Sequence, residues 1–74
     1  MKVTLESTTK IVQVNGVYAR IWEGETDTGI PVHAFVTRIA APEKENQEQF
    51  KRELVECCEP RDERIKSYPM RMVL

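Results

Sequence analysis

The only histidine of the chain, His33, is the first residue to consider for chemistry. Histidine can act as a general base or as a metal ligand near neutral pH. In the hairpin register derived below, His33 lies opposite Glu23, and a Glu–His pair across neighbouring strands accounts for both side chains without a catalytic function. We therefore expect a structural or surface role for His33.

Two adjacent cysteines, Cys57 and Cys58, can form a nucleophile pair or provide soft metal ligands. Structural zinc sites are four-coordinate, and their paired cysteines are separated by about two to four residues. One histidine and two adjacent cysteines fall short of that set. On the apolar side of a helix a cysteine behaves as a small hydrophobe, and we expect that role here.

Three carboxylates, those of Glu23, Glu25 and Asp27, surround the second turn and have the chemistry to hold a divalent cation. Their spacing does not match an EF-hand loop, so we interpret the stretch as a solvated turn. The chain also lacks the phosphate-binding patterns GxxxxGK and GxGxxG and a serine nucleophile elbow. The sequence thus offers no catalytic residue, no metal site and no cofactor motif, and we expect that the protein is not an enzyme.

The length of 74 residues is enough for one domain, covering residues 1–74. A domain this small buries only about 60% of its unfolded surface, so its stability margin is thin. Small domains often gain stability from disulfides, a metal or self-association. Because two adjacent cysteines are no disulfide framework, we expect the protein to form a homo-oligomer.

The 11 basic and 12 acidic residues nearly cancel, which argues against nucleic-acid binding through bulk charge. No apolar run approaches the roughly 20 residues that span a bilayer, and the N-terminal stretch lacks the apolar core of a secretion signal. We therefore expect a cytoplasmic protein without a membrane partner. Residues 42–60 carry a net charge of −3, which is typical of the solvent face of an amphipathic helix.

Asn15-Gly16 is the strongest local signal for the elements that position these side chains. Both residues tolerate positive φ, as the central positions of a type I′ hairpin turn require. A two-residue loop pairs Val14 with Val17 and Val12 with Ala19. This register divides the side chains of both strands between two faces of a sheet.

A second hairpin is predicted at Asp27-Thr28-Gly29, whose residue types suit a three-residue loop closed by a left-handed glycine. The register then places Phe35 opposite Ile21, Thr37 opposite Ala19 and Ile39 opposite Val17. A slip of one residue would exchange the two faces of the third strand. The predicted core face is aliphatic and comprises Val12, Val14, Val17, Ala19, Ile21, Phe35 and Ile39.

Residues 46–58 follow a helical pattern, in which one face carries Phe50, Leu54, Cys57 and Cys58. Residues 61–66 are compatible with one further turn, and the final MRMVL alternates like a short strand. The predicted fold class is α+β: a small antiparallel sheet of three to five strands, built from two consecutive hairpins over about residues 10–40. One amphipathic helix at about 46–58 is expected to cover the aliphatic face, with a short C-terminal strand beside it.

The opposite sheet face combines aromatic, aliphatic and cationic side chains. We call it the Trp22 face and define it as Tyr18, Arg20, Trp22, Val36 and Arg38. Trp, Tyr and Arg are the residue types most enriched at interface hot spots, and one helix cannot cover both faces of a sheet. Self-association, or capture of a protein partner, would cover this face; otherwise residues 67–74 or the N-terminus would fold over it.

The same five residues also permit two other functions. A small-ligand site is one, in which Arg20, Arg38 and Trp22 hold an anionic or aromatic molecule such as a nucleotide. Weak nucleic-acid binding on a minimal sheet platform is the other, although the balanced charge speaks against it.

The run NGVYARIWEGETDTGIPVHAFVTRIA, together with a chain end near PMRMVL, resembles short uncharacterised proteins encoded by temperate bacteriophages and prophages. The resemblance covers about residues 4–74 and is one of overall pattern. It implies a small product of a phage genome in the host cytoplasm, and it brings no site residues. Since many short phage products bind a host or phage protein, the resemblance favours an interaction function.

Overall fold

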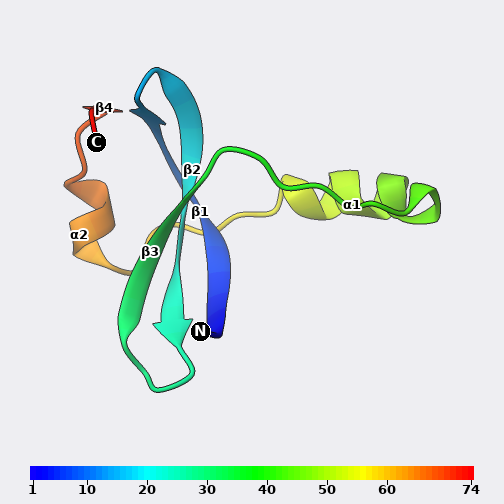
Figure 1. The fold of residues 1–74 in the computed structure, drawn as a ribbon, viewed down its shortest axis with the longest axis horizontal. Helices are drawn as coiled ribbons and strands as arrows, with labels where there is room; N and C mark the ends of the chain where they lie inside the picture. The colour runs from blue at the N-terminus through cyan, green and yellow to red at the C-terminus, as the bar shows by residue number, and fades with distance from the viewer.

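A computed structural model describes residues 1–74 and places them in one small sheet with two helices (Figure 1). The elements in chain order are β1 (Val3–Val14), β2 (Val17–Thr26), β3 (Pro31–Val36), the 3-10 turn η1 (Lys44–Asn46), α1 (Gln47–Leu54), α2 (Glu63–Lys66) and β4 (Arg71–Met72). The spatial strand order is β3-β2-β1-β4. The predicted α+β class is confirmed, with a helical segment from Lys44 to Leu54 and a short C-terminal strand. The sheet is mixed rather than antiparallel, because β4 pairs in parallel with β1.

The first hairpin has the predicted turn and register. Asn15 and Gly16 adopt φ values of 51° and 83°, as a type I′ turn requires at its two central residues. Val14 pairs with Val17 and Val12 with Ala19. The local chemistry of two turn residues was therefore sufficient to set this register.

The second hairpin has the predicted register along all of β3. Gly29 has a φ of 89°, and Phe35 lies opposite Ile21. The predicted pairs of Thr37 and Ile39 are wrong, because strand pairing ends at Val36 and the chain then leaves the sheet. Ile39 is accordingly 46% exposed and does not belong to the core.

β1 is longer than predicted and contains an irregularity. Its register shifts between Ser7, which pairs with Trp22, and Ile11, which pairs with Arg20. The inserted stretch is fixed by two side-chain hydrogen bonds: Thr8 Oγ1 donates to the Ile21 carbonyl (2.6 Å), and Arg20 Nη1 donates to the Thr8 carbonyl (2.7 Å). A bulge satisfied in this way bends the strand without leaving polar groups unpaired.

The core lies on the aliphatic sheet face and is built around Val12, Ile21 and Ile65, all fully buried. The partly buried side chains that pack against this cluster are Val14, Phe35, Tyr68 and Met72. Since Ile65 belongs to α2 and Tyr68 follows it, the C-terminal part of the chain covers this face (Figure 1).

The predicted position of the long helix is wrong in two respects. α1 ends at Leu54 instead of Cys58, and none of its side chains is buried. Figure 1 shows α1 extending away from the sheet, while α2 lies beside the strands. Ile65 occupies the place in the core that the sequence pattern assigned to the face of residues 46–58. The radius of gyration of 13.3 Å exceeds the roughly 11 Å of a compact domain of this length, which agrees with an extending α1.

Candidate functional site

The Trp22 face lies on the side of the sheet that α2 does not cover. Residues alternate between faces along a strand, so Tyr18, Arg20 and Trp22 point away from the buried Ala19 and Ile21. Val36 is paired with Arg20 and joins the same side from β3. The predicted separation of an aliphatic face from an aromatic and cationic face is therefore present in the structure.

A groove of about 650 Å³ runs over this face, and all five residues predicted for it line the groove. The full lining comprises Ile11, Tyr18, Ala19, Arg20, Trp22, Val36, Thr37, Arg38, Ile39, Ala40, Leu54 and Val55. Nine of these twelve residues are hydrophobic, so the groove is an apolar surface with a few polar groups at its margin. It is suited to bind an apolar segment that carries some negative charge.

The side chains of the groove differ in solvent exposure and in whether they already make hydrogen bonds within the chain. Tyr18 is 66% exposed, whereas Trp22 is half-buried. Arg20 is half-buried, and its guanidinium is occupied by the Thr8 carbonyl. Arg38 is exposed beyond the end of β3, so it is the cation that is available to a bound molecule.

Neither end of the chain folds over the groove. The C-terminal segment contributes Tyr68 and Met72 to the opposite face, and β4 pairs with the edge of β1. The N-terminal residues form β1 itself. Sequence reasoning missed Leu54 and Val55 as neighbours of Trp22, because the helical pattern placed Leu54 on the aliphatic face.

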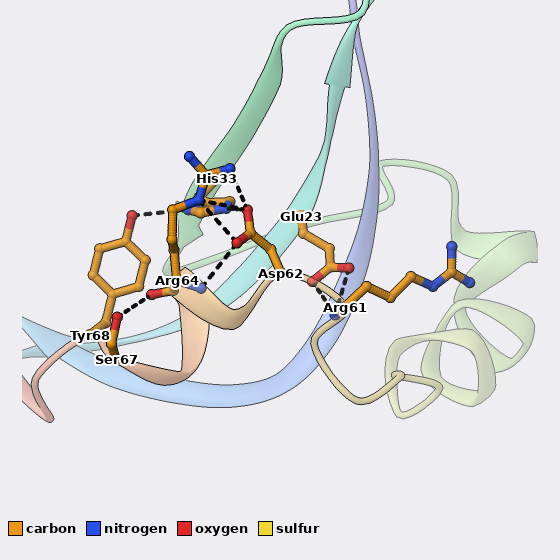
Figure 2. A network of polar contacts seen from close by, with 7 residues as sticks. All are labelled: Glu23, His33, Arg61, Asp62, Arg64, Ser67 and Tyr68. Atoms are coloured by element: carbon orange, nitrogen blue, oxygen red, sulfur yellow. Dashed lines mark hydrogen bonds and ion pairs between the residues drawn. The ribbon is translucent and has the colours of Figure 1, made fainter.

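His33 belongs to a polar cluster on the other side of the sheet (Figure 2). Its Nε2 lies 2.8 Å from Asp62 Oδ2, and its Nδ1 lies 3.0 Å from the Tyr68 hydroxyl. An ionised carboxylate only accepts, so Nε2 carries the proton; in the neutral ring Nδ1 then accepts from Tyr68. With both nitrogens bonded and a side-chain exposure of 12%, His33 has no ring nitrogen available to a substrate or metal.

The expected side-chain pair of His33 with Glu23 is wrong, although the two residues do lie opposite each other. Both carboxylate oxygens of Glu23 instead accept the backbone N–H of Arg61, each at 2.9 Å (Figure 2). The loop before α2 thus provides the hydrogen-bond partners of both side chains: Arg61 for Glu23 and Asp62 for His33. The sequence signal for this was Asp62 directly before a helical turn, the position of an N-cap.

Asp62 is the centre of the cluster. Its carboxylate caps α2 by accepting the backbone N–H of Arg64 at 3.0 Å, and it also binds the Arg64 guanidinium at 2.8 Å. Hydrogen bonds from the Arg64 side chain and backbone, and then from His33, hold the pKa of Asp62 well below its ordinary value. The pKa of Arg64 is raised by the same carboxylate. These contacts attach α2 to the sheet.

A second cavity of about 470 Å³ beside this cluster is lined by polar residues, including Glu6, Glu23, Glu25, Arg61 and Asp62. Two of its carboxylates are already engaged by Arg61, since Glu6 Oε2 lies 3.6 Å from the Arg61 guanidinium and Glu23 binds the Arg61 N–H. No group of three or more His, Cys, Asp or Glu side chains in the structure is arranged to hold a metal ion.

The cysteines lie in a different place from the one predicted. Cys57 and Cys58 follow α1 instead of belonging to it, and both are exposed. The backbone of Cys58 bridges β1: its N–H donates to the Ser7 carbonyl (3.1 Å), and its carbonyl accepts the Thr9 N–H (2.9 Å). The segment after α1 is thus attached to the β1 bulge through its backbone, and the thiols do not pack in the core.

Comparison with known proteins gives no relative from which a function could be transferred: no family model, no curated protein and no solved structure matches this chain. None of its helices has the length and apolar character needed to cross a membrane. The groove at the Trp22 face and the His33–Asp62 cluster are therefore the two features from which a function can be inferred.

Proposed function

We propose that this protein is a small non-enzymatic interaction protein that binds a protein segment, from a second copy or from another protein, in the groove at the Trp22 face. The observation that carries the proposal is the groove itself. Its volume is about 650 Å³ and its lining is mostly hydrophobic. The C-terminal segment packs on the opposite face, and the N-terminal segment forms β1, so neither covers the groove. An apolar surface of this kind on a small domain is a mark of a binding site.

The residue types favour a protein partner. Tyr18 and Trp22 are large, rigid anchors, and Arg38 provides an exposed cation at the margin. This combination is typical of the few residues that dominate binding energy at protein interfaces. The partner segment is expected to combine apolar side chains with carboxylates.

A small-ligand site is the second candidate, because the groove volume lies within the roughly 300–1,000 Å³ that ligand pockets occupy. The position of Arg20 counts against a nucleotide. Its guanidinium is already bonded to the Thr8 carbonyl, which leaves Arg38 as the single exposed arginine in the groove. Thermal-shift measurements with nucleotides test this alternative, and stabilisation by any of them would favour it over a protein partner.

The proposed setting is the cytoplasm of a phage-infected or lysogenic bacterial host. It is supported by the resemblance of the run from Asn15 to Ala40 to short phage-encoded proteins. The net charge of −1 supports a protein partner over nucleic acid, since phosphate binding relies on excess Lys and Arg.

Size-exclusion chromatography with light scattering, combined with partner capture from host cells, tests the proposed function. Wild-type protein is expected to self-associate or to retain a defined partner, and Tyr18→Ala/Trp22→Ala is expected to lose that association while keeping its circular dichroism spectrum. Val73→Ala is the matched control, because Val73 is 92% exposed and lies outside the groove. A monomeric wild type whose double variant keeps every partner would overturn the proposal.

A further inference from the structure

The two edges of the sheet differ in how much of their backbone is already paired. Along β1, backbone hydrogen bonds with three later residues cover the bulge and the C-terminal half of the strand, namely with Cys58, Met70 and Met72. β3 forms the other edge and pairs only with β2. None of the backbone hydrogen bonds outside the ladders and helices involves residues 31–36. The outer edge of β3 is thus open to a further strand.

The ladder between β2 and β3 shows which backbone groups of β3 face outward. Thr26 N–H donates to the Ile30 carbonyl (2.9 Å) in the same register as the strand pairs, so these two residues form a hydrogen-bonded pair. Bonded and non-bonded pairs alternate along an antiparallel ladder. The residues of β3 that bond to β2 are therefore Val32, Ala34 and Val36. The N–H groups of His33 and Phe35 then point outward, together with the carbonyls of these two residues and of Pro31.

β3 lacks the features that prevent strand addition at an exposed edge. Natural edge strands carry charged side chains, internal prolines or bulges. Val32–Val36 contains no Lys, Arg, Asp or Glu, the only proline stands at the start of the strand, and its register is unbroken. The imidazole of His33 is already bonded on the core side. By contrast, the N-terminal part of β1 contains Glu6 and follows Lys2, both of which are exposed.

A second copy of β3 is complementary to this edge in antiparallel orientation. With a two-fold axis at Ala34, His33 of each copy faces Phe35 of the other, and each of these two pairs exchanges two N–H···O=C bonds. The resulting four bonds use every outward N–H of β3 and require none from its initial proline. On the Trp22 side, Val32 of each copy lies opposite Val36 of the other, so β-branched side chains pair across the interface.

The charges at the two ends of β3 also match in this orientation. Antiparallel pairing places the residues after Val36 of one copy beside the turn before Pro31 of the other. Arg38 is exposed at the first position, and Glu25 and Asp27 are exposed at the second. Opposite charges thus meet at both ends of the interface. Parallel pairing would instead bring the two Arg38 side chains together.

We propose that two copies of this chain associate edge to edge through antiparallel pairing of their β3 strands, with the two-fold axis at Ala34. The two four-stranded sheets then form one continuous sheet, and the same residues serve on both subunits. The pairing extends the sheet sideways and leaves the Trp22 face open, so it goes beyond the proposed function and does not depend on it. Because one pair of short strands is a small interface, the dimer is expected to be weak and concentration-dependent.

Disulfide trapping tests the register directly. Ala34→Cys is made in a Cys57→Ser/Cys58→Ser background, because both native thiols are exposed. Ala34 bonds to β2, so across the new interface it forms a non-bonded pair, in which the two Cα atoms at position 34 lie about 4.5 Å apart. A disulfide spans this distance. Oxidised glutathione is expected to convert the variant to a covalent dimer.

Val32→Cys in the same background is the matched control. Val32 faces Val36 of the other copy, so the two Val32 positions are four residues apart along the strands, about 14 Å, which is too far for a disulfide. Val32→Cys is expected to stay monomeric alone and to cross-link when mixed with Val36→Cys. Cross-linking of Val32→Cys alone, to the same extent as Ala34→Cys or more, would overturn the proposed pairing.

Sedimentation velocity over a concentration series measures the non-covalent dimer. Val32→Lys is expected to raise the dimer dissociation constant by about tenfold or more, because a lysine on an edge strand opposes strand addition. Val3→Lys is the matched control, since Val3 is 43% exposed and lies on β1, and it is expected to dimerise like wild type. Circular dichroism checks the fold of each variant; if Val32→Lys does not fold, the cross-linking result decides.

The groove variants separate this inference from the proposed function. A dimer that persists in Tyr18→Ala/Trp22→Ala and is lost in Val32→Lys supports β3 pairing, and capture of another protein then tests the groove. A dimer that is lost in the double variant and kept in Val32→Lys is held by the groove; the inference then fails and the proposed function stands. A wild type that stays monomeric, together with an Ala34→Cys variant that does not cross-link, also overturns the inference, and partner capture decides the proposed function separately.

Discussion

His33 Nε2 lies 2.8 Å from Asp62 Oδ2, and this contact joins β3 to the first residue before α2. The same carboxylate caps α2 and binds Arg64. α2 in turn carries Ile65, which is fully buried against Val12 and Ile21. One acidic side chain therefore positions the helix that closes the core of this sheet.

Asp62→Ala is expected to destabilise the domain, because it removes the helix cap, the ion pair with Arg64 and the bond to His33. Loss of a cap alone is measurably destabilising in most helices. Glu59→Ala is a suitable control at an exposed acid nearby. The melting temperature measured by circular dichroism should fall clearly more for Asp62→Ala than for Glu59→Ala, and equal values would show that the cluster does not hold α2.

Acid is expected to weaken the folded state through Asp62. Its pKa is lowered in the folded protein from an ordinary value of 3.8, so the unfolded chain takes up a proton first as the pH falls. The stabilisation is present above about pH 4 and is lost progressively as the pH falls towards the folded-state pKa. Urea unfolding between pH 7 and pH 2 should show this decline in wild type and a shallower one in Asp62→Asn; parallel curves would contradict it.

Ile65→Ala is expected to cost about 2–5 kcal/mol, as for other fully buried large aliphatic residues. Leu54→Ala in α1 serves as its counterpart, because Leu54 is 43% exposed and the expected change in the monomer is within about 0.5 kcal/mol. Urea denaturation of both variants, at a protein concentration too low for self-association, measures the two changes in the free energy of unfolding. A larger loss from Leu54→Ala would instead support a helix packed on the aliphatic face.

The sequence did not indicate that Ile65, and not Leu54, fills the core. Asn15-Gly16 set the first hairpin because a type I′ turn is a local requirement of two residues, and the alternation of faces followed from it. Whether Leu54 or Ile65 fills the core depends on how the chain after Val36 leaves the sheet. Both residues lie in helical patterns, and no local signal distinguishes them.

For the candidate site, too, the residues placed by strand register were predictable from the sequence, and the residues brought in by long-range packing were not. Tyr18, Arg20, Trp22 and Val36 line one groove because they alternate along two strands of known register. Arg38 lines the same groove from the segment that follows β3. Leu54 and Val55 reach its margin through a long-range arrangement, and so do the bonds of His33 to Asp62 and Tyr68. Contacts of this kind join residues about 30 positions apart, and periodicity within a strand or helix carries no information about them.

Substitution of Gly24 and of Gly16 by alanine is expected to destabilise the fold for two different reasons. At Gly24 there is no space for a Cβ, and at Gly16 the backbone conformation is strained for a residue with a side chain. A Cβ at Gly24 would collide with the carbonyl group of Thr4 and the Cα of Leu5 on β1, and backbone atoms within a sheet cannot move aside. A Cβ at Gly16 would meet nothing within 4 Å, but the φ of 83° is costly for any residue with a side chain, by roughly 1–2 kcal/mol.

Gly24→Ala is therefore expected to prevent stable pairing of β1 with β2 and to leave the chain largely unfolded. Gly16→Ala should fold with a lower melting temperature, and Gly16→Asn should recover part of the loss, because Asn tolerates the left-handed region better than Ala does. Circular dichroism and one-dimensional proton NMR of the three variants measure this order. A well-folded Gly24→Ala would mean that β1 and β2 lie further apart at Leu5 than this structure places them.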